Sequence, residues 1–181
     1  LSNLKLRASY GESGALAADP FQYLSSYNLY SNSAVLNGKP TQGLSELLEP
    51  NKYITWEKAR KMDIGFDLGL LNNQISFSID YFSEYRSNML VKPQVTVPFE
   101  YGIGIAQENK GKMKNRGIEF SLNASNQFTK DFSAGLQVNF TYAKNKIVEI
   151  FETPATYNNP YRRQTGRPLG QKFGYKALGY F

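Results

Sequence analysis

Apolar and polar residues alternate through residues 61–85, which is the strongest pattern in the chain. Every second position is apolar from Met62 to Leu70 and again from Ile75 to Tyr81. A period of two is typical of β-strands. A two-residue turn at Asn72-Asn73 would join the two runs into a hairpin with all of these apolar side chains on one face. The other face would be polar and mostly small.

A second hairpin is predicted from residues 116–128 and 132–142, where apolar residues again occupy every second position. A three-residue turn, Thr129 to Asp131, would pair Phe128 with Phe132 and keep the apolar side chains of both arms on one face. A two-residue turn would place them on opposite faces, because a shift of one residue exchanges the two faces of a strand. The pattern therefore predicts the register as well as the strands.

Residues 1–12 also alternate and predict a first strand. Three stretches lack such a period and are predicted to be long loops, at about 13–52, 86–115 and 146–167. Tight turns at one end and long loops at the other are typical of outer-membrane barrels. We therefore predict one all-β unit over residues 1–181, with antiparallel up-and-down strands forming a partial transmembrane β-barrel wall. The alternation alone does not exclude a soluble β-sandwich, because strands that turn one face to a protein core alternate with the same period.

Composition removes several classes of function. Hydrophobic residues make up 41% of the chain, but no apolar run approaches the roughly 18 residues of a membrane helix, so a membrane role would use strands. The chain has no cysteine and no histidine, which excludes thiol chemistry and removes the commonest general base and metal ligand. We expect no cofactor and no metal site. The net charge of +6 is accompanied by no nucleic-acid-binding motif, so no nucleic acid is expected as a partner.

Residues 166–181 read GRPLGQKFGYKALGYF. This segment resembles the G-x-P-x-G-x-x-x-G-Y-x-x-x-G-x-F signature of the SusC/RagA-like family of TonB-dependent outer-membrane transporters. Earlier stretches resemble the same family in the same order. They are residues 4–14 (LKLRASYGESG), 54–57 (ITWE), 62–82 (the first hairpin) and 111–119 (GKMKNRGIE).

The resemblance implies a plugged barrel of roughly 22 strands in the bacterial cell outer membrane. It also implies import of glycans or peptides together with a SusD-like surface lipoprotein, with energy supplied through TonB. In the family orientation the tight turns face the periplasm, the long loops are extracellular, and one face of the sheet meets outer-membrane lipid. We expect this chain to be an internal piece of such a transporter, with no plug domain and no enzymatic activity.

Two groups of residues are candidates for contacts. The polar face is predicted to line the lumen or contact the plug, through Asp63, Asp67, Asp80, Glu84, Glu119 and Asn139. The last loop offers candidate substrate contacts at Tyr157, Tyr161, Arg162 and Arg163, since aromatic rings stack on sugars and arginine pairs with carboxylates. The simpler interpretations are a solvated polar face and a loop that is polar and aromatic for other reasons.

Two other classes of protein are compatible with parts of the sequence. The acid pair Asp63 and Asp67, or Asp80 and Glu84, could be compared with the two carboxylates of a glycosidase, but alternation along a strand explains both pairs without chemistry. A soluble β-sheet carbohydrate-binding module is the main alternative. If the chain is seen in isolation, we expect its apolar face to be covered by a second sheet or by loops folded back on it, because an uncovered face of this kind favours aggregation.

Overall fold

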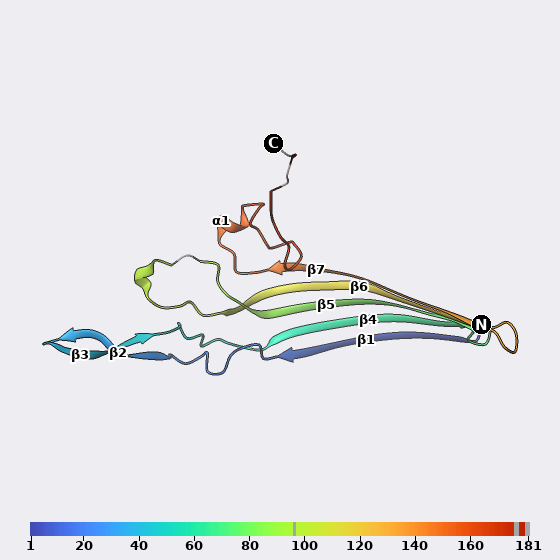
Figure 1. The fold of residues 1–181 in the computed structure, drawn as a ribbon, viewed down its shortest axis with the longest axis horizontal. Coiled ribbons are helices and arrows are strands. Elements are labelled where there is room, and N and C mark those ends of the chain that lie inside the picture. Colours follow the sequence, from blue (N-terminus) through green and yellow to red (C-terminus); the bar gives the residue numbers. More distant parts are fainter. Residues whose placement is uncertain (96, 176–177, 180–181) are drawn as a thin grey trace.

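The computed structural model describes residues 1–95, 97–175 and 178–179. Five long strands run side by side in one antiparallel sheet, in the order β1-β4-β5-β6-β7, and β2 and β3 form a separate hairpin (Figure 1). The strands are β1 (Asn3–Ala15), β2 (Tyr27–Leu36), β3 (Lys39–Glu46), β4 (Glu57–Leu70), β5 (Ile75–Val91), β6 (Glu108–Gln127) and β7 (Ser133–Glu149). The predicted all-β, antiparallel fold class is confirmed, and the sheet is open at β1 and β7.

Helical structure is limited to two short elements in the described part of the chain. They are the 3-10 helix η1 (Phe99–Tyr101) and α1 (Pro154–Tyr157). α1 is capped by the Thr153 side chain, which accepts a hydrogen bond from the Thr156 amide at 3.3 Å. None of the helices that the structure describes has the length and apolar character needed to cross a membrane.

The register aligns apolar side chains in rows that cross all five strands of the main sheet. The middle row contains Leu6, Phe66, Ile79, Phe120 and Phe140. Tilted aromatic pairs link part of this face, with ring centroids 5.8 Å apart for Phe66 and Phe77. The two neighbouring rows contain Leu4, Leu68, Phe77, Leu122 and Val138 on one side, and Ala8, Ile64, Tyr81, Ile118 and Tyr142 on the other.

The apolar face lacks a second protein layer in the part of the chain that the structure describes. Within those residues the buried hydrophobic side chains are Ala106 and Ile147, neither of which belongs to the apolar rows. Leu6 is 76% exposed and Phe140 is 57% exposed. The expected cover of a second sheet or folded-back loops is therefore wrong. The expectation rested on the free-energy cost of exposing apolar surface to water, and no protein layer among the described residues offsets that cost.

The two tight turns lie where the sequence predicted them. Leu70 faces Ile75 as expected, and the first turn is the four-residue segment 71–74, with positive φ at Leu71, Asn72 and Asn73. The Gln74 amide donates to the Leu71 carbonyl at 3.1 Å, so Asn72 and Asn73 are the central residues of the turn, as predicted. The strands stop pairing one residue earlier on each side, which leaves the register unchanged. In the second turn the Phe128 amide donates to the Phe132 carbonyl at 3.0 Å, as a three-residue loop requires.

The irregular segments are shorter than the predicted long loops and contain more regular secondary structure. Strands β1, β5 and β7 extend to Ala15, Val91 and Glu149, and β6 begins at Glu108. Residues 13–52 contain the β2–β3 hairpin, whose turn has positive φ at Asn37 and Gly38 (52° and 73°). This hairpin lies beyond the end of β4 opposite the tight turns (Figure 1). The correction has a physical cause, since Asn-Gly is the preferred two-residue hairpin turn.

Candidate functional site

The strand register places every predicted polar-face residue on the face opposite the apolar rows. Successive side chains of a strand point to opposite faces, so residues that alternate with the apolar ones share the other side. These residues are Asp63 and Asp67 on β4, Asp80 and Glu84 on β5, Glu119 on β6 and Asn139 on β7. The shared polar face follows from the register, while contact with a lumen or plug stays a prediction.

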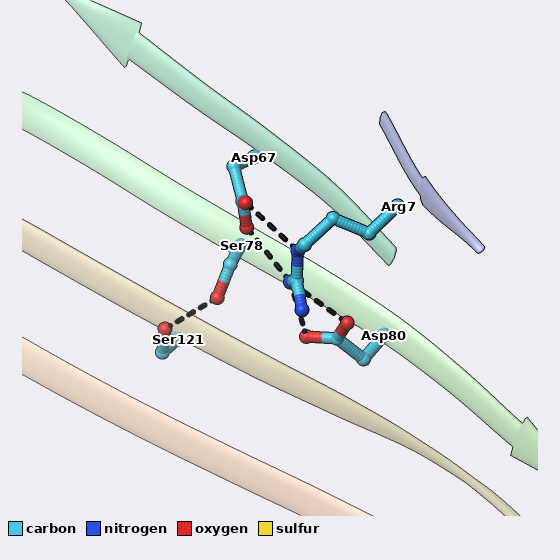
Figure 2. Close-up of polar contacts among 5 residues, drawn as sticks. All are labelled: Arg7, Asp67, Ser78, Asp80 and Ser121. Carbon is cyan, nitrogen blue, oxygen red and sulfur yellow. Dashed lines mark hydrogen bonds and ion pairs between the residues drawn. The ribbon is translucent and has the colours of Figure 1, made fainter. Parts of the chain in front are cut away.

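Arg7 of β1 joins two of these acids into one cluster (Figure 2). Its Nε and Nη2 donate to the two oxygens of Asp67, each at 2.8 Å. The same Nη2 donates to Asp80 Oδ2 at 3.1 Å and lies 2.8 Å from Asp80 Oδ1, although the second contact lacks hydrogen-bond geometry. Paired N–H groups on one carboxylate hold an arginine in a fixed orientation. The cluster thus links β1, β4 and β5 and keeps one net negative charge.

Gly65 provides the space in which the guanidinium lies. It is buried and faces Arg7 directly across the β1–β4 pair. A Cβ atom at position 65 would lie 2.1 Å from Asp80 Oδ1 and 2.8 Å from Arg7 Nη2. A glycine inside a strand often marks such a close approach. The cluster therefore depends on the absence of a side chain at this position.

The remaining acids of the polar face are not drawn into this cluster. Glu84 pairs with Arg86 at 2.5 Å on the same strand. The hydroxyls of Ser78 and Ser121 share a hydrogen bond of 2.8 Å beside the cluster (Figure 2). The described residues contain no group of three or more acids, histidines or cysteines arranged to hold a metal ion. This surface offers hydrogen bonds and negative charge to a polar partner.

Arg7 is not among the residues predicted for the polar face, although the sequence carries a signal for it. Arg7 alternates with Leu6 and Ala8 and so belongs to the polar face of its strand. What the sequence lacks is the sheet order, which puts β1 beside β4 across a 41-residue separation between the two strands. The close spacing of Gly65 and Asp67 was a second signal, because a glycine beside an acid leaves room for a long side chain from a neighbouring strand.

The segment after β7 forms an open hollow of about 560 Å³ at the loop end of the sheet. Two of the predicted substrate contacts, Tyr161 and Arg162, line it, together with Arg167 and Phe173. The other two predicted contacts, Tyr157 and Arg163, lie outside its lining, and the Arg163 guanidinium is 5.5 Å from the centre of the Tyr157 ring. The structure thus divides the four candidates into two pairs.

Glu152 organises the loop around this hollow. Its carboxylate accepts hydrogen bonds from the Gln164 amide at 2.7 Å, the Thr165 amide at 3.1 Å and the Thr165 hydroxyl at 2.5 Å. Burial alone would raise the pKa of Glu152, but these hydrogen bonds and the charge of Arg163 outweigh it and leave the pKa below its usual 4.5. Because the folded pKa is lowered, this carboxylate stabilises the loop above pH 4.5 and the effect is lost as the pH falls through the folded pKa.

We expect Glu152→Gln to loosen this loop in the full-length protein. Two acceptors become one neutral acceptor, so the amides of Gln164 and Thr165 should exchange with deuterium at least about tenfold faster at pH 7. Glu149→Gln is the control, since Glu149 pairs with Lys112 at 2.5 Å and makes no contact with the loop amides. Equal exchange rates in wild type and Glu152→Gln would contradict the assigned role.

Asn109, near the start of β6, links the segment before β4 to the end of β5. Its side-chain amide donates to the carbonyls of Thr55 (2.9 Å) and Asn88 (2.7 Å), and its Oδ1 accepts from the Thr55 amide at 3.0 Å. A parallel bridge between Leu48 and Gly104 adds to this connection. The loop end of the sheet is therefore built from segments that are distant in sequence.

Comparison with known proteins identifies the family of this chain. The family model for the TonB dependent receptor-like β-barrel matches residues 1–180. TonB-dependent receptor P26 of Formosa agariphila is 33% identical over 81% of this chain and 14% of its own length. TonB-dependent receptor SusC of Bacteroides thetaiotaomicron is 32% identical over 83% of this chain and 15% of its own length.

Solved structures show the same fold. The RagAB peptide importer in its closed-closed state superposes with a TM-score of 0.76 at 25% identity, over 92% of this chain and 18% of that one. The RagAB importer in its open-open state gives a TM-score of 0.73 with the same coverage. This chain spans between 14% and 19% of the length of the curated relatives that it matches. Family members are outer-membrane receptors and transporters rather than enzymes, and this chain belongs to the β-barrel of the TonB-dependent receptors, within the SusC/RagA-like family.

Proposed function

We propose that this chain forms part of the barrel wall of an outer-membrane transporter that imports glycans or peptides. One observation carries the proposal. The main sheet is a single layer whose apolar rows have no protein cover among the described residues, while its other face holds the polar cluster around Arg7. A soluble β-sheet module would bury that apolar face in a core. A barrel wall instead turns it to lipid and turns the polar face to the lumen.

In this orientation the two faces have different partners. Lipid of the outer membrane contacts the apolar rows. The lumen side, with Asp63, Asp67, Asp80, Glu84, Glu119 and Asn139, hydrogen-bonds water or the plug of the full-length protein. The turns at 71–74 and 129–131 face the periplasm, and the β2–β3 hairpin and the segment after β7 lie outside the cell. TonB acts on parts of the protein that the described strands do not include.

The partner at the extracellular side is a SusD-like lipoprotein. Support comes from the similarity to SusC and to the RagAB peptide importer. The β2–β3 hairpin supplies a contact surface, because it projects from the loop end of the sheet and carries exposed apolar side chains (Figure 1). These include Leu29, Val35, Leu36 and Leu44.

The hollow after β7 is the proposed substrate contact. Tyr161 is 78% exposed and offers a ring for stacking on a sugar or an aromatic peptide side chain. Arg162, from the same lining, pairs with carboxylates of acidic sugars or of peptide termini. We expect Tyr161→Ala with Arg162→Ala to raise the KM for uptake about tenfold, while Tyr53→Ala, an exposed tyrosine on another loop, leaves it unchanged.

Cysteine accessibility tests the orientation of the sheet. Ser76 and Phe77 are neighbours on β5 and point to opposite faces, and this chain has no cysteine of its own. In full-length protein in outer-membrane vesicles, with any other cysteine replaced, Ser76→Cys should react with a membrane-impermeant thiol reagent. Phe77→Cys should react only after detergent is added. Equal reaction of both in buffer would favour the soluble carbohydrate-binding module.

Uptake by cells tests the transport itself. A strain that lacks the full-length protein should fail to take up the substrate, found by screening labelled oligosaccharides and peptides, and a plasmid copy should restore uptake. A protonophore should abolish it, because the energy comes from the proton gradient through TonB. Uptake that continues in the deletion strain across the whole panel would overturn the proposed function.

A further inference from the structure

On β6 and β7, the face that carries the apolar rows becomes basic toward the loop end of the sheet. Arg116 lies directly opposite Lys144, and Lys114 lies directly opposite Lys146. All four side chains are exposed. We call these four residues the basic block. The first irregularity in the β6–β7 register lies at Lys112 and Met113, beyond the block, so its alternation with the apolar rows is unbroken.

The basic block therefore lies on the apolar face and not on the polar one. Arg116 is two residues before Ile118 on β6, and Lys144 is two residues after Tyr142 on β7, so each points to the same face as its apolar neighbour. Tyrosines mark the boundary, with Tyr142 in the last apolar row and Tyr85 in the row of Lys114. The Lys114 ammonium is 5.7 Å from the centre of the Tyr85 ring. A tyrosine girdle is typical of the level at which a barrel leaves the hydrocarbon of a membrane.

The four positive charges have no acidic partner among the residues that the structure describes. Nearby carboxylates are committed to other cations, Glu149 to Lys112 at 2.5 Å and Glu12 to Arg60 at 2.9 Å. Like charges directly opposite each other destabilise a pair of strands. The arrangement is therefore unfavourable unless an anion lies over it.

We propose that the basic block binds the phosphate groups of a phosphorylated glycolipid in the outer leaflet of the membrane. This inference rests on the proposed function, because it needs the loop end of the sheet to face the outside. Successive rows are about 7 Å apart along a strand, so the charges begin one row beyond the Tyr142 row, at headgroup depth. A ligand there must place acyl chains on the apolar rows and anionic oxygens on the block, which a lipid does and a free anion does not.

The charges act together on this ligand. Each basic side chain near an anionic membrane surface contributes a similar favourable free energy of binding. Four of them in one patch therefore select multiply phosphorylated headgroups over neutral ones. Phosphate accepts hydrogen bonds from both lysine and arginine. The block would thus fix a headgroup beside the mouth of the barrel, between the lipid belt and the extracellular loops.

The test uses the full-length protein in neutral detergent with purified diphosphoryl lipid A as the probe. The quadruple variant Lys114→Gln, Arg116→Gln, Lys144→Gln and Lys146→Gln should bind it at least about tenfold more weakly than wild type by native mass spectrometry. The matched control removes four cations outside the block, at Lys5, Lys61, Lys92 and Lys130, and should bind as wild type does. Dephosphorylated lipid A should bind wild type and both variants equally. Inorganic phosphate at equal phosphate concentration should not displace diphosphoryl lipid A from wild type.

Two results would overturn the inference. One is equal loss of lipid A binding in the block and control variants, which would mean a response to net charge alone. The other is unchanged binding in the block variant. Sedimentation with the outer membrane and substrate uptake are measured on the same proteins. If wild type inserts and transports but the block variant still binds lipid A, only this inference fails, whereas a wild type that does not insert overturns the proposed function.

Discussion

Phe140→Arg is expected to destabilise the full-length transporter in lipid vesicles by about 2–4 kcal/mol, the cost of an arginine near the middle of the lipid face of a barrel. Phe140 lies in the middle apolar row, next to Phe120 across the β6–β7 pair. Its side chain is 57% exposed in this chain, so no protein packing accounts for a loss of that size. Urea unfolding of protein folded into vesicles measures the difference.

Asn139→Arg is the matched control for this prediction. Asn139 precedes Phe140 on β7 and points to the polar face, where an arginine remains hydrated. We expect a change within about 0.5 kcal/mol, as for most surface substitutions. Equal effects at the two positions would mean that neither face meets lipid, and would contradict the proposed orientation of the sheet.

The sequence predicted the strands of the main sheet and their register because one physical rule governs both. Each hairpin has one arrangement in which the apolar sets coincide, so Phe66 had to face Ile79 and Phe120 had to face Phe140. The rule does not depend on how close to the turn the strands remain paired. Leu71 adopts a positive φ of 51° that its side chain disfavours, so the end of strand pairing at Leu70 could not be predicted from residue preferences.

The loops were predicted less well because their order comes from contacts between distant segments. The Asn37-Gly38 turn is a signal for the β2–β3 hairpin, but the flanking residues alternate weakly, and their pattern predicts a loop. The links made by Asn109 join the segment before β4 to β6, and only the sheet order brings these two together. Arg7 is the same case on the polar face, since its partners lie on two other strands.

Gly65→Ala is expected to destabilise the full-length protein by about 1–3 kcal/mol, although alanine is ordinarily the better strand residue. The new methyl group would lie 2.1 Å from Asp80 Oδ1, so either that carboxylate or the Arg7 guanidinium must move. Asp80 has a short side chain on a strand paired on both sides, which leaves it little room to yield. Urea unfolding in vesicles again gives the change in the free energy of unfolding.

Gly11→Ala separates this clash from the general effect of replacing a strand glycine. Gly11 lies on the polar face of β1, and a methyl group added there would meet no other atom within 4 Å, so the substitution should be neutral or stabilise by up to about 1 kcal/mol. Adding Asp80→Ala to Gly65→Ala removes the closest atom of the clash, so the double variant should lose less stability than the sum of the single ones. Strict additivity would show that the cost at position 65 arises elsewhere, and the Arg7 cluster would then not be what requires a glycine there.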